Sequence, residues 1–252
     1  MGDFTGQTIV VTGGSGGLGR AIATAFAGQG GRVVVADLDL PAAEAVAASL
    51  EGAVAHPLDV TDEASWDALL DRVDADLGGL DVLVNNAGIF VPNIPFEDMS
   101  LDLWRRHIAV NLDGTFLGCR QAIRRMKGRG KGAIVNMGSG MSIRANPLAS
   151  AYCASKAGVL MTTRTAAHAA GKYGIRVNCV LPGPVHTAML MGNVAPGGDE
   201  DAFLTRMLGN SPMGVMASPE DIAAGVVFLA SPAAKAITGV HLPVDGGNMP
   251  GG

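Results

Sequence analysis

The chain has 252 residues, 48% of them hydrophobic and 16% charged, so it has material for a sizeable core and is not a disordered protein. Its 18 Lys and Arg against 23 Asp and Glu give a net charge of −5 without a basic stripe, which argues against a nucleic-acid partner. Three cysteines without metal-site spacing predict no metal and favour a reducing, cytoplasmic setting. Neither a secretory leader nor an apolar run of membrane-spanning length is visible, so we expect no membrane partner.

Short runs rich in Val and Ile alternate with longer segments of helical period. The predicted strands are 8–11, 32–36, 53–58, 80–84, 133–137, 176–180 and 240–244. The predicted helices are 17–28, 41–50, 62–77, 100–127, 150–173 and 219–230. This alternation is typical of βαβ units, so we predict an α/β fold: a single domain over residues 1–252, with a Rossmann-type, doubly wound parallel sheet of about seven strands and helices on both faces.

A glycine-rich turn follows the first predicted strand directly, and a helix follows the turn. It reads Thr12-Gly13-Gly14-Ser15-Gly16-Gly17-Leu18-Gly19. The free N–H groups and the positive dipole end of such a helix suit a pyrophosphate, and glycines let the backbone approach it closely. A flexible loop is the alternative, but the order of strand, turn and helix favours dinucleotide binding.

Asp37 ends the second predicted strand, where a carboxylate can accept hydrogen bonds from the adenosine ribose hydroxyls and would repel a 2′-phosphate. No Lys or Arg stands among residues 13–19 to pair with such a phosphate. We therefore expect NAD as the cofactor, rather than NADP. The alternative is a solvated carboxylate at a strand end, near Asp39.

Tyr152 and Lys156 lie four residues apart on a predicted helix and therefore share one of its faces. A neighbouring ammonium lowers the pKa of a phenol, so we expect Tyr152 to serve as a general acid and base. Taken alone, such a pair is a common surface contact. Ser139 strengthens the interpretation, because it follows a Val- and Ile-rich strand and so lies at the carboxyl edge of the sheet, where ligands bind.

Taken together, these residues resemble the short-chain dehydrogenase/reductase family. The glycine turn, Ser139, and Tyr152 with Lys156 carry the resemblance, with Asn85-Asn86-Ala87-Gly88, Asn111, the stretch 182–187 and Asp245-Gly246-Gly247. The resemblance implies that Tyr152 exchanges a proton with the substrate, Ser139 positions the substrate oxygen and Lys156 also binds the nicotinamide ribose. It further implies that Asn111 holds a water for proton relay. The family often has a serine where this chain has Gly138, and Ser142 follows nearby; the spacing to Tyr152 still favours Ser139.

The resemblance also implies the cofactor-binding residues and a homotetramer. Tyr152 and Lys156 belong to this set, and the other members are Gly13, Ser15, Gly16, Gly17, Leu18, Gly19, Asp37, Leu38, Asp59, Val60, Asn86, Ala87, Gly88, Pro182, Gly183, Val185 and Thr187. For Asp59, a carboxylate that merely starts a loop is an alternative interpretation.

The stretch 182–212 reads as irregular, and loops of that length are usually functional or mobile. By the resemblance, residues 186–213 form a mobile substrate lid. Methionines adapt to varied apolar surfaces, so those at 189, 191, 207, 213 and 216, with Ile89, Phe90, Val91, Met141 and Ile143, favour an apolar or cyclic substrate. The alternative is that these methionines only pack the lid.

The predicted activity is an NAD-dependent interconversion of a secondary alcohol and a ketone. One alternative is an NADPH-dependent carbonyl reductase of the 3-oxoacyl type, against which Asp37 argues. Another is a sugar-nucleotide epimerase or dehydratase, which would carry a further substrate domain. The third is a nucleotide-binding sensor without catalysis.

Overall fold

Seven strands form one parallel sheet in the computed structural model, which describes residues 4–194, 197–209 and 211–248. The strands are β1 (Thr8–Thr12), β2 (Arg32–Asp37), β3 (Val54–Pro57), β4 (Val82–Asn85), β5 (Gly132–Met137), β6 (Ile175–Pro182) and β7 (His241–Val244). Their order is β3-β2-β1-β4-β5-β6-β7. The predicted Rossmann-type fold and its seven strands are confirmed, with small shifts at the strand ends.

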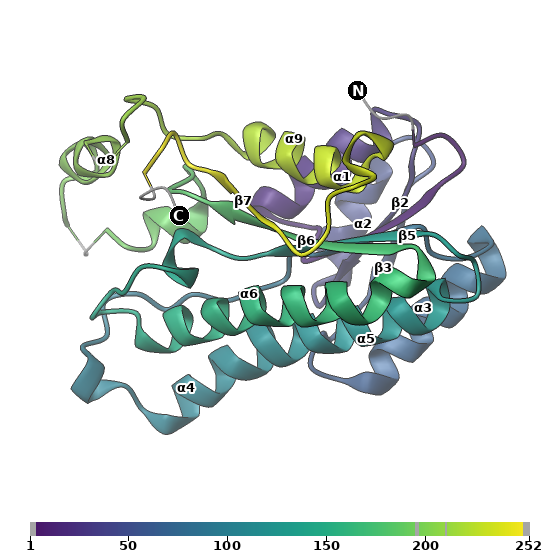
Figure 1. Cartoon of the computed structure of the whole chain (residues 1–252). Helices are drawn as coiled ribbons and strands as arrows, with labels where there is room; N and C mark the ends of the chain where they lie inside the picture. Colours follow the sequence, from purple (N-terminus) through teal and green to yellow (C-terminus); the bar gives the residue numbers. More distant parts are fainter. Residues whose placement is uncertain (1–3, 195–196, 210, 249–252) are drawn as a thin grey trace.

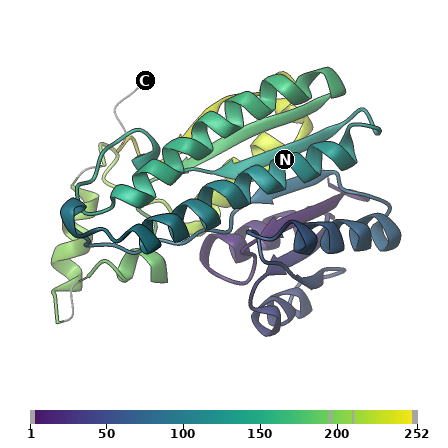
Figure 2. The same ribbon diagram turned by 90° about the horizontal axis from the view of Figure 1, so that it is seen from below.

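Helices cover both faces of the sheet (Figures 1 and 2). One face carries α1 (Gly17–Ala27), α2 (Leu40–Ala48) and α9 (Pro219–Ala230), and the other carries α3 (Glu63–Leu77), α4 (Leu101–His107), α5 (Gly114–Met126) and α6 (Ser150–Ala170). Phe26 and Ile222 belong to one core, and Trp66 and Leu69 to the other. Because both faces are covered, a strand such as β1 is buried at every position and reads as a continuous apolar run.

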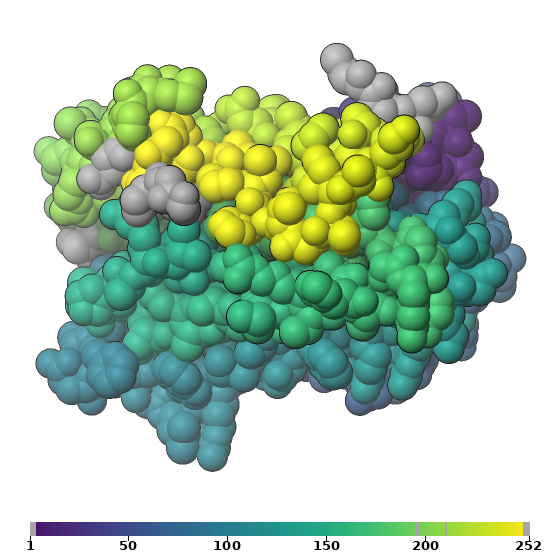
Figure 3. Space-filling model, viewed as in Figure 1, coloured from purple at the N-terminus to yellow at the C-terminus, as the bar shows by residue number. Residues whose placement is uncertain are grey.

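The winding of the sheet reverses at β1, which pairs with β2 on one side and with β4 on the other. In open parallel sheets, ligands bind outside the carboxyl ends of the strands at such a reversal. There β1 leads into the glycine turn, β4 into residues 86–88 and β5 into Ser139. The edge strand β7, at one end of the sheet, lies on the surface between α6 and α9 (Figure 3). No helix in the described part of the chain is long and apolar enough to cross a membrane.

The helix predicted over residues 100–127 is present without a break, but its winding changes in the middle. Between α4 and α5 the segment Ile108–Asp113 forms a π-helical turn, in which the N–H of Gly114 donates to the carbonyl of Ala109, five residues back. The Thr115 hydroxyl donates to the Asn111 carbonyl at 2.7 Å. Such turns widen a helix locally and are frequent at functional sites. The apolar pattern is helical on both sides of the turn and therefore does not reveal it.

The stretch 182–212, which reads as irregular, contains two short helices. Thr187 caps α7 (Ala188–Met191) by accepting a hydrogen bond from the Leu190 N–H, and Asp199 caps α8 (Glu200–Leu208) through the Ala202 N–H. Figure 1 shows α8 standing apart from the two helical layers. Residues 195, 196 and 210 of the predicted lid lie outside the described residues.

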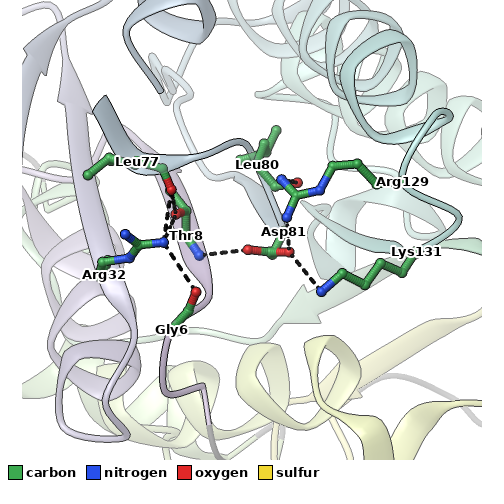
Figure 4. A network of polar contacts seen from close by, with 8 residues as sticks. All are labelled: Gly6, Thr8, Arg32, Leu77, Leu80, Asp81, Arg129 and Lys131. Atoms are coloured by element: carbon green, nitrogen blue, oxygen red, sulfur yellow. Dashed lines mark hydrogen bonds and ion pairs between the residues drawn. The ribbon is translucent and has the colours of Figure 1, made fainter. Parts of the chain in front are cut away.

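A buried carboxylate connects three strands at the amino edge of the sheet, opposite the glycine turn (Figure 4). The side chain of Asp81, 8% exposed, accepts a hydrogen bond from the Thr8 N–H at 2.9 Å. It also pairs with Arg129 at 2.8 Å and with Lys131 at 3.5 Å. Because these cations lie between α5 and β5, one carboxylate joins the starts of β1, β4 and β5.

Replacing Asp81 by Asn should destabilise the protein, because the amide keeps the shape and loses both ion pairs. We expect the free energy of unfolding, measured by urea denaturation, to fall by about 2 kcal/mol, between the values for exposed and buried pairs. Asp76→Asn is the matched control: Asp76 pairs with Arg72 at 2.7 Å, and both side chains are at least half exposed. The control should lose less than about 0.5 kcal/mol; equal losses would contradict a special role for Asp81.

Candidate active site

The glycine turn is held against the segment that follows β4. Gly13 has a φ of 60°, and a Cβ there would lie 2.8 Å from the Ala87 Cα. The Asn86 side chain donates to the carbonyls of Thr12 and Gly13 at 2.9 and 3.0 Å. At Gly19 a Cβ would collide with the Gly13 carbonyl. These contacts require glycine at positions 13 and 19, and they fix the turn against the segment that follows β4.

The other side of the turn is open. A Cβ built on Gly16 would meet nothing within 4 Å, and one on Gly17 would meet only the Thr187 methyl at 3.8 Å. Gly16 is the N-cap of α1 and offers no side chain to the N–H groups of its first turn. A space bordered by glycines at the positive end of an 11-residue helix fits a pyrophosphate. Residues 13–19 therefore fit the dinucleotide that the sequence predicts.

Asp37 lies beside this turn. Its Oδ2 accepts hydrogen bonds from the Ser15 N–H at 3.0 Å and the Ser15 hydroxyl at 2.6 Å, and its Oδ1 accepts from the Asp39 N–H at 3.1 Å. A carboxylate offers about four acceptor positions, so capacity remains for a ribose hydroxyl. The neighbouring Leu38 is 75% exposed. The arrangement places the Asp37 carboxylate against the glycine turn, and its contact with a ribose stays a prediction.

Asp59 and Val60, predicted near the adenine, are engaged by the protein itself. Asp59 accepts hydrogen bonds from the N–H and the hydroxyl of Thr61 at 2.8 and 2.7 Å. Val60 is 9% exposed and packs closely against Gly114 of α5, and its carbonyl accepts from the Trp66 indole. Their contact with a cofactor stays a prediction.

Ser139, Tyr152 and Lys156 meet where β5 ends and α6 begins. The Ser139 side chain acts on the Tyr152 phenol as a hydrogen-bonding neighbour that lowers its pKa. The Lys156 ammonium, on a side chain 4% exposed, lies 5.7 Å from the centre of the Tyr152 ring and donates to the Met137 carbonyl at 2.8 Å. The three residues that the sequence predicts as one unit are therefore brought together in one place.

Ser142 and Ser139 make different hydrogen bonds in the turn that follows β5. The Ser142 hydroxyl accepts from the Ser139 N–H at 3.1 Å, and the Ser139 hydroxyl accepts from the Met141 N–H at 3.1 Å. This reciprocal capping fixes a short turn that presents Ser139 to Tyr152. Gly138 is also explained, since a Cβ there would lie 2.9 Å from the Cys179 sulfur and collide with Leu181.

The protonation of the pair departs from the sequence-based expectation. Desolvation raises the pKa of Tyr152 to about 12, and the hydrogen bond with Ser139 lowers it only in part. Desolvation also lowers the pKa of Lys156 to about 8. The net direction for Tyr152 is thus opposite to the predicted one, because desolvation outweighs the effect of Ser139 and the ammonium is turned to the Met137 carbonyl.

Asn111 lies in the π-helical turn and is fully buried. Its Oδ1 accepts from the Ile89 N–H at 2.8 Å, and its Nδ2 donates to the Ile89 carbonyl and to the Ser155 hydroxyl, each at 3.0 Å. A Cβ on Gly88 would lie 3.2 Å from the Asn111 side chain and 3.5 Å from the Lys156 ammonium. The structure thus brings Asn111, Gly88 and Lys156 together, while the water relay stays a prediction.

The segment after β6 reaches back to the glycine turn. The Gly183 N–H donates to the Val244 carbonyl, and a Cβ at Gly183 would lie 2.6 Å from that of Asp245. Val185 is 5% exposed, and the Thr187 methyl faces Gly17. Thr187 therefore approaches the glycine turn, whereas contact of Pro182, Gly183 and Val185 with a cofactor stays a prediction. Among the described residues, no three His, Cys, Asp or Glu side chains form a group that could hold a metal ion.

The sequence interpretation missed His107. This side chain is fully buried and is hydrogen bonded to the segment that follows Gly88. Its position four residues before Asn111, and so on the same helix face, is the signal that could have revealed it.

Comparison with known proteins adds an independent result. A family model described as enoyl-(acyl carrier protein) reductase matches residues 13–248. A D-threitol dehydrogenase of Mycolicibacterium smegmatis is 43% identical over 96% of this chain and 92% of its own length. A cis-4-hydroxycyclohexanecarboxylate dehydrogenase of Sinomonas cyclohexanicum is 42% identical over 97% of each chain.

A solved structure agrees with these sequence relatives. The crystal structure of gox2181 superposes with a TM-score of 0.92 at 33% identity, covering 98% of this chain and 96% of its own. The fold, the order of the motifs and these similarities over nearly the whole length lead to one conclusion: the chain belongs to the short-chain dehydrogenase/reductase family of oxidoreductases.

Proposed function

We propose that the protein is an NAD-dependent oxidoreductase that interconverts a secondary alcohol and a ketone. The observation that carries the proposal is the grouping of Ser139, Tyr152 and Lys156 at the carboxyl edge of the sheet, with the Lys156 ammonium 5.7 Å from the centre of the Tyr152 ring. Relatives over nearly the whole length are dehydrogenases of alcohols, which supports this class of reaction.

In this mechanism Tyr152 exchanges the proton of the substrate oxygen, and the Ser139 hydroxyl holds that oxygen in place. NAD, when bound, supplies the hydride acceptor. Near neutral pH, the raised pKa of Tyr152 favours the neutral phenol, which can donate a proton to a ketone oxygen. Oxidation of an alcohol requires the phenolate; the Lys156 ammonium, 5.7 Å from the ring centre, favours that anion but does not outweigh the desolvation that raises the pKa of Tyr152. Asn111 would hold a water that carries the proton onward from the site.

Asp37 supports NAD over NADP. The carboxylate can accept from ribose hydroxyls and would repel a 2′-phosphate in the same place. Its Oδ2 is already held by Ser15, so the charge is fixed rather than free to turn away. An NADPH-dependent 3-oxoacyl reductase is disfavoured on the same ground.

Apolar side chains near the candidate site favour an apolar or cyclic substrate. The Phe90 ring lies 4.6 Å from the Tyr152 ring, and Ile143 and Met189, which the sequence predicts near the substrate, each expose 46% of their surface. The relative that acts on a hydroxycyclohexane carboxylate fits this view, whereas the D-threitol dehydrogenase makes a small polyol the second candidate. Turnover of cyclohexanols against tetritols decides between them; faster use of tetritols would overturn the apolar assignment.

We propose a cytoplasmic homotetramer on the basis of exposed apolar side chains and free cysteines. Leu101, Phe116 and Met161, on α4, α5 and α6, expose about half of their surface or more, which suits subunit contacts in a homotetramer. The three cysteines are free thiols, which suits the cytoplasm. Size-exclusion chromatography with light scattering would test the tetramer.

Tyr152→Phe should abolish most turnover, because the ring remains and the exchangeable proton is lost. We expect kcat/KM for the alcohol to fall by about 10²- to 10⁴-fold, while the NADH dissociation constant measured by fluorescence stays within about twofold. Tyr173→Phe, at the only other tyrosine of the chain, is the matched control and should retain full activity. Equal activity of Tyr152→Phe and the wild type would remove Tyr152 from the mechanism. Intact NADH binding without turnover of any alcohol by the wild type would favour a sensor.

Asp37→Asn should weaken the preference for NAD, because the amide neither repels a phosphate nor accepts as strongly from a ribose hydroxyl. The ratio of kcat/KM with NAD to that with NADP should fall by about 10- to 100-fold, the range of one hydrogen bond to a charged group. Asp39→Asn removes an equal charge two residues away, from the cap of α2. It should change the ratio by less than about threefold. A wild-type enzyme that prefers NADP would contradict the assignment of NAD as the cofactor.

The buried Lys156 ammonium predicts a stability that depends on pH. Its pKa of about 8 in the folded state lies below the ordinary 10.5, so between these values the unfolded chain binds more protons and the free energy of unfolding rises with pH. Relative to Lys156→Met, the wild type should gain about 2 kcal/mol between pH 7.5 and 10 in urea denaturation. Above pH 10 the raised pKa of Tyr152 acts in the opposite direction, since the folded state then retains the proton. A constant difference between the two proteins would contradict the buried, shifted ammonium.

A further inference from the structure

His107 is a buried histidine whose two ring nitrogens are both used. It ends α4, is 0% exposed, and lies outside the set of residues to which we assign chemistry. Its Nδ1 is 2.9 Å from the Leu103 carbonyl, and its Nε2 is 3.2 Å from the Val91 nitrogen. A carbonyl only accepts and a backbone N–H only donates, so the ring is neutral with its proton on Nδ1. Such a ring has no free nitrogen for proton transfer to a substrate.

The segment that His107 binds is also held by Asn111, one helical turn further on. Asn111 binds both the N–H and the carbonyl of Ile89, at 2.8 and 3.0 Å. Residues 89 and 91 are therefore each fixed by a side chain from the same helix face, with Phe90 between them. Two fixed neighbours restrict the backbone of Phe90 and so the direction of its ring.

The Phe90 ring is placed where a substrate would meet the reacting groups. It lies 4.6 Å from the Tyr152 ring, tilted by 44°, and remains partly exposed. Further along the segment, Asn93 has a φ of 62°, and its side chain donates to the Asn193 carbonyl in the predicted lid at 3.2 Å. One short segment thus touches the phenol with one residue and the lid with another.

We propose that His107 is a positioning residue for substrate selection: through Val91 it holds Phe90 against Tyr152, as the wall on which a cyclic or bulky alcohol packs. The inference rests on the proposed function. Without the Nε2 acceptor, the Val91 N–H loses its partner and the ring of Phe90 leaves its place. Bulky substrates then lose a packing surface, whereas the smallest alcohols, which do not reach the ring, lose little.

The test compares two variants of similar size. His107→Leu removes the acceptor, whereas His107→Gln has a carbonyl oxygen long enough to reach the Val91 N–H. His168→Leu, at an exposed position of α6, controls for the loss of a histidine. We expect KM for cyclohexanol to rise by about tenfold in His107→Leu, with kcat and KM for 2-propanol changed by less than about threefold. His107→Gln should recover most of the loss. Equal loss on both alcohols, or no recovery in a folded His107→Gln, would overturn the proposal.

Amide hydrogen exchange separates this inference from the proposed function, because it needs no turnover. In His107→Leu the peptide that covers residues 89–94 should exchange at least tenfold faster than in the wild type, while peptides of β5 and α6 stay unchanged. Unchanged exchange in residues 89–94 would refute the role of His107 even if the enzyme oxidises alcohols. Faster exchange in a protein that turns over no alcohol would refute the proposed function and leave His107 as the residue that holds the segment.

Discussion

The hydrogen bond from the Lys156 ammonium to the Met137 carbonyl determines the geometry of the candidate site. An ammonium that is almost completely buried needs a partner, and a carbonyl at the end of β5 supplies it at 2.8 Å. This bond fixes α6 to the end of the strand from which Ser139 follows two residues later. Tyr152 lies one turn earlier on α6, so the same contact sets its distance from Ser139. A single polar contact between a helix and a strand thereby assembles three side chains from two elements.

A buried network of polar side chains also connects α6 to the sheet. Asn85 of β4 donates to the Asn136 side chain of β5 at 2.8 Å, and Asn136 donates to the Thr163 hydroxyl of α6 at 2.9 Å. The two asparagines are register partners in adjacent strands. Polar groups in such a core are tolerated because each has a partner, and their directionality limits sliding of α6 along the sheet. Burial also raises the pKa of the adjoining Cys119 thiol to about 12, so the network carries no ionised thiol at neutral pH.

The sequence predicts those parts of the molecule that depend on local pattern. Strands buried on both faces appear as runs of Val and Ile, the glycine turn follows from spacing, and Tyr152 and Lys156 are related by one helical turn. The π-helical turn escapes prediction because it depends on Asn111 being drawn to Ile89, a contact between distant segments. His107 and Asp81 escape for the same reason, since their partners, Val91 and Arg129, are joined to them only by the fold. The direction of the Tyr152 pKa is wrong because adjacency to a lysine is visible in sequence, whereas desolvation is not.

The chemical and substrate-facing parts of the site are coupled, although they are built on different kinds of structure. Ser139, Tyr152 and Lys156 sit on a strand end and a helix that the core holds rigid, whereas Phe90 sits on a connecting segment. The Phe90 ring packs on the Tyr152 ring, with the ring centres 4.6 Å apart, and so covers part of it. Loss of water is the main cause of the raised pKa of Tyr152. A change in this segment that enlarges the substrate site would therefore admit water and move the pKa of Tyr152 back toward its ordinary value, so the choice of substrate and the strength of the acid cannot vary independently.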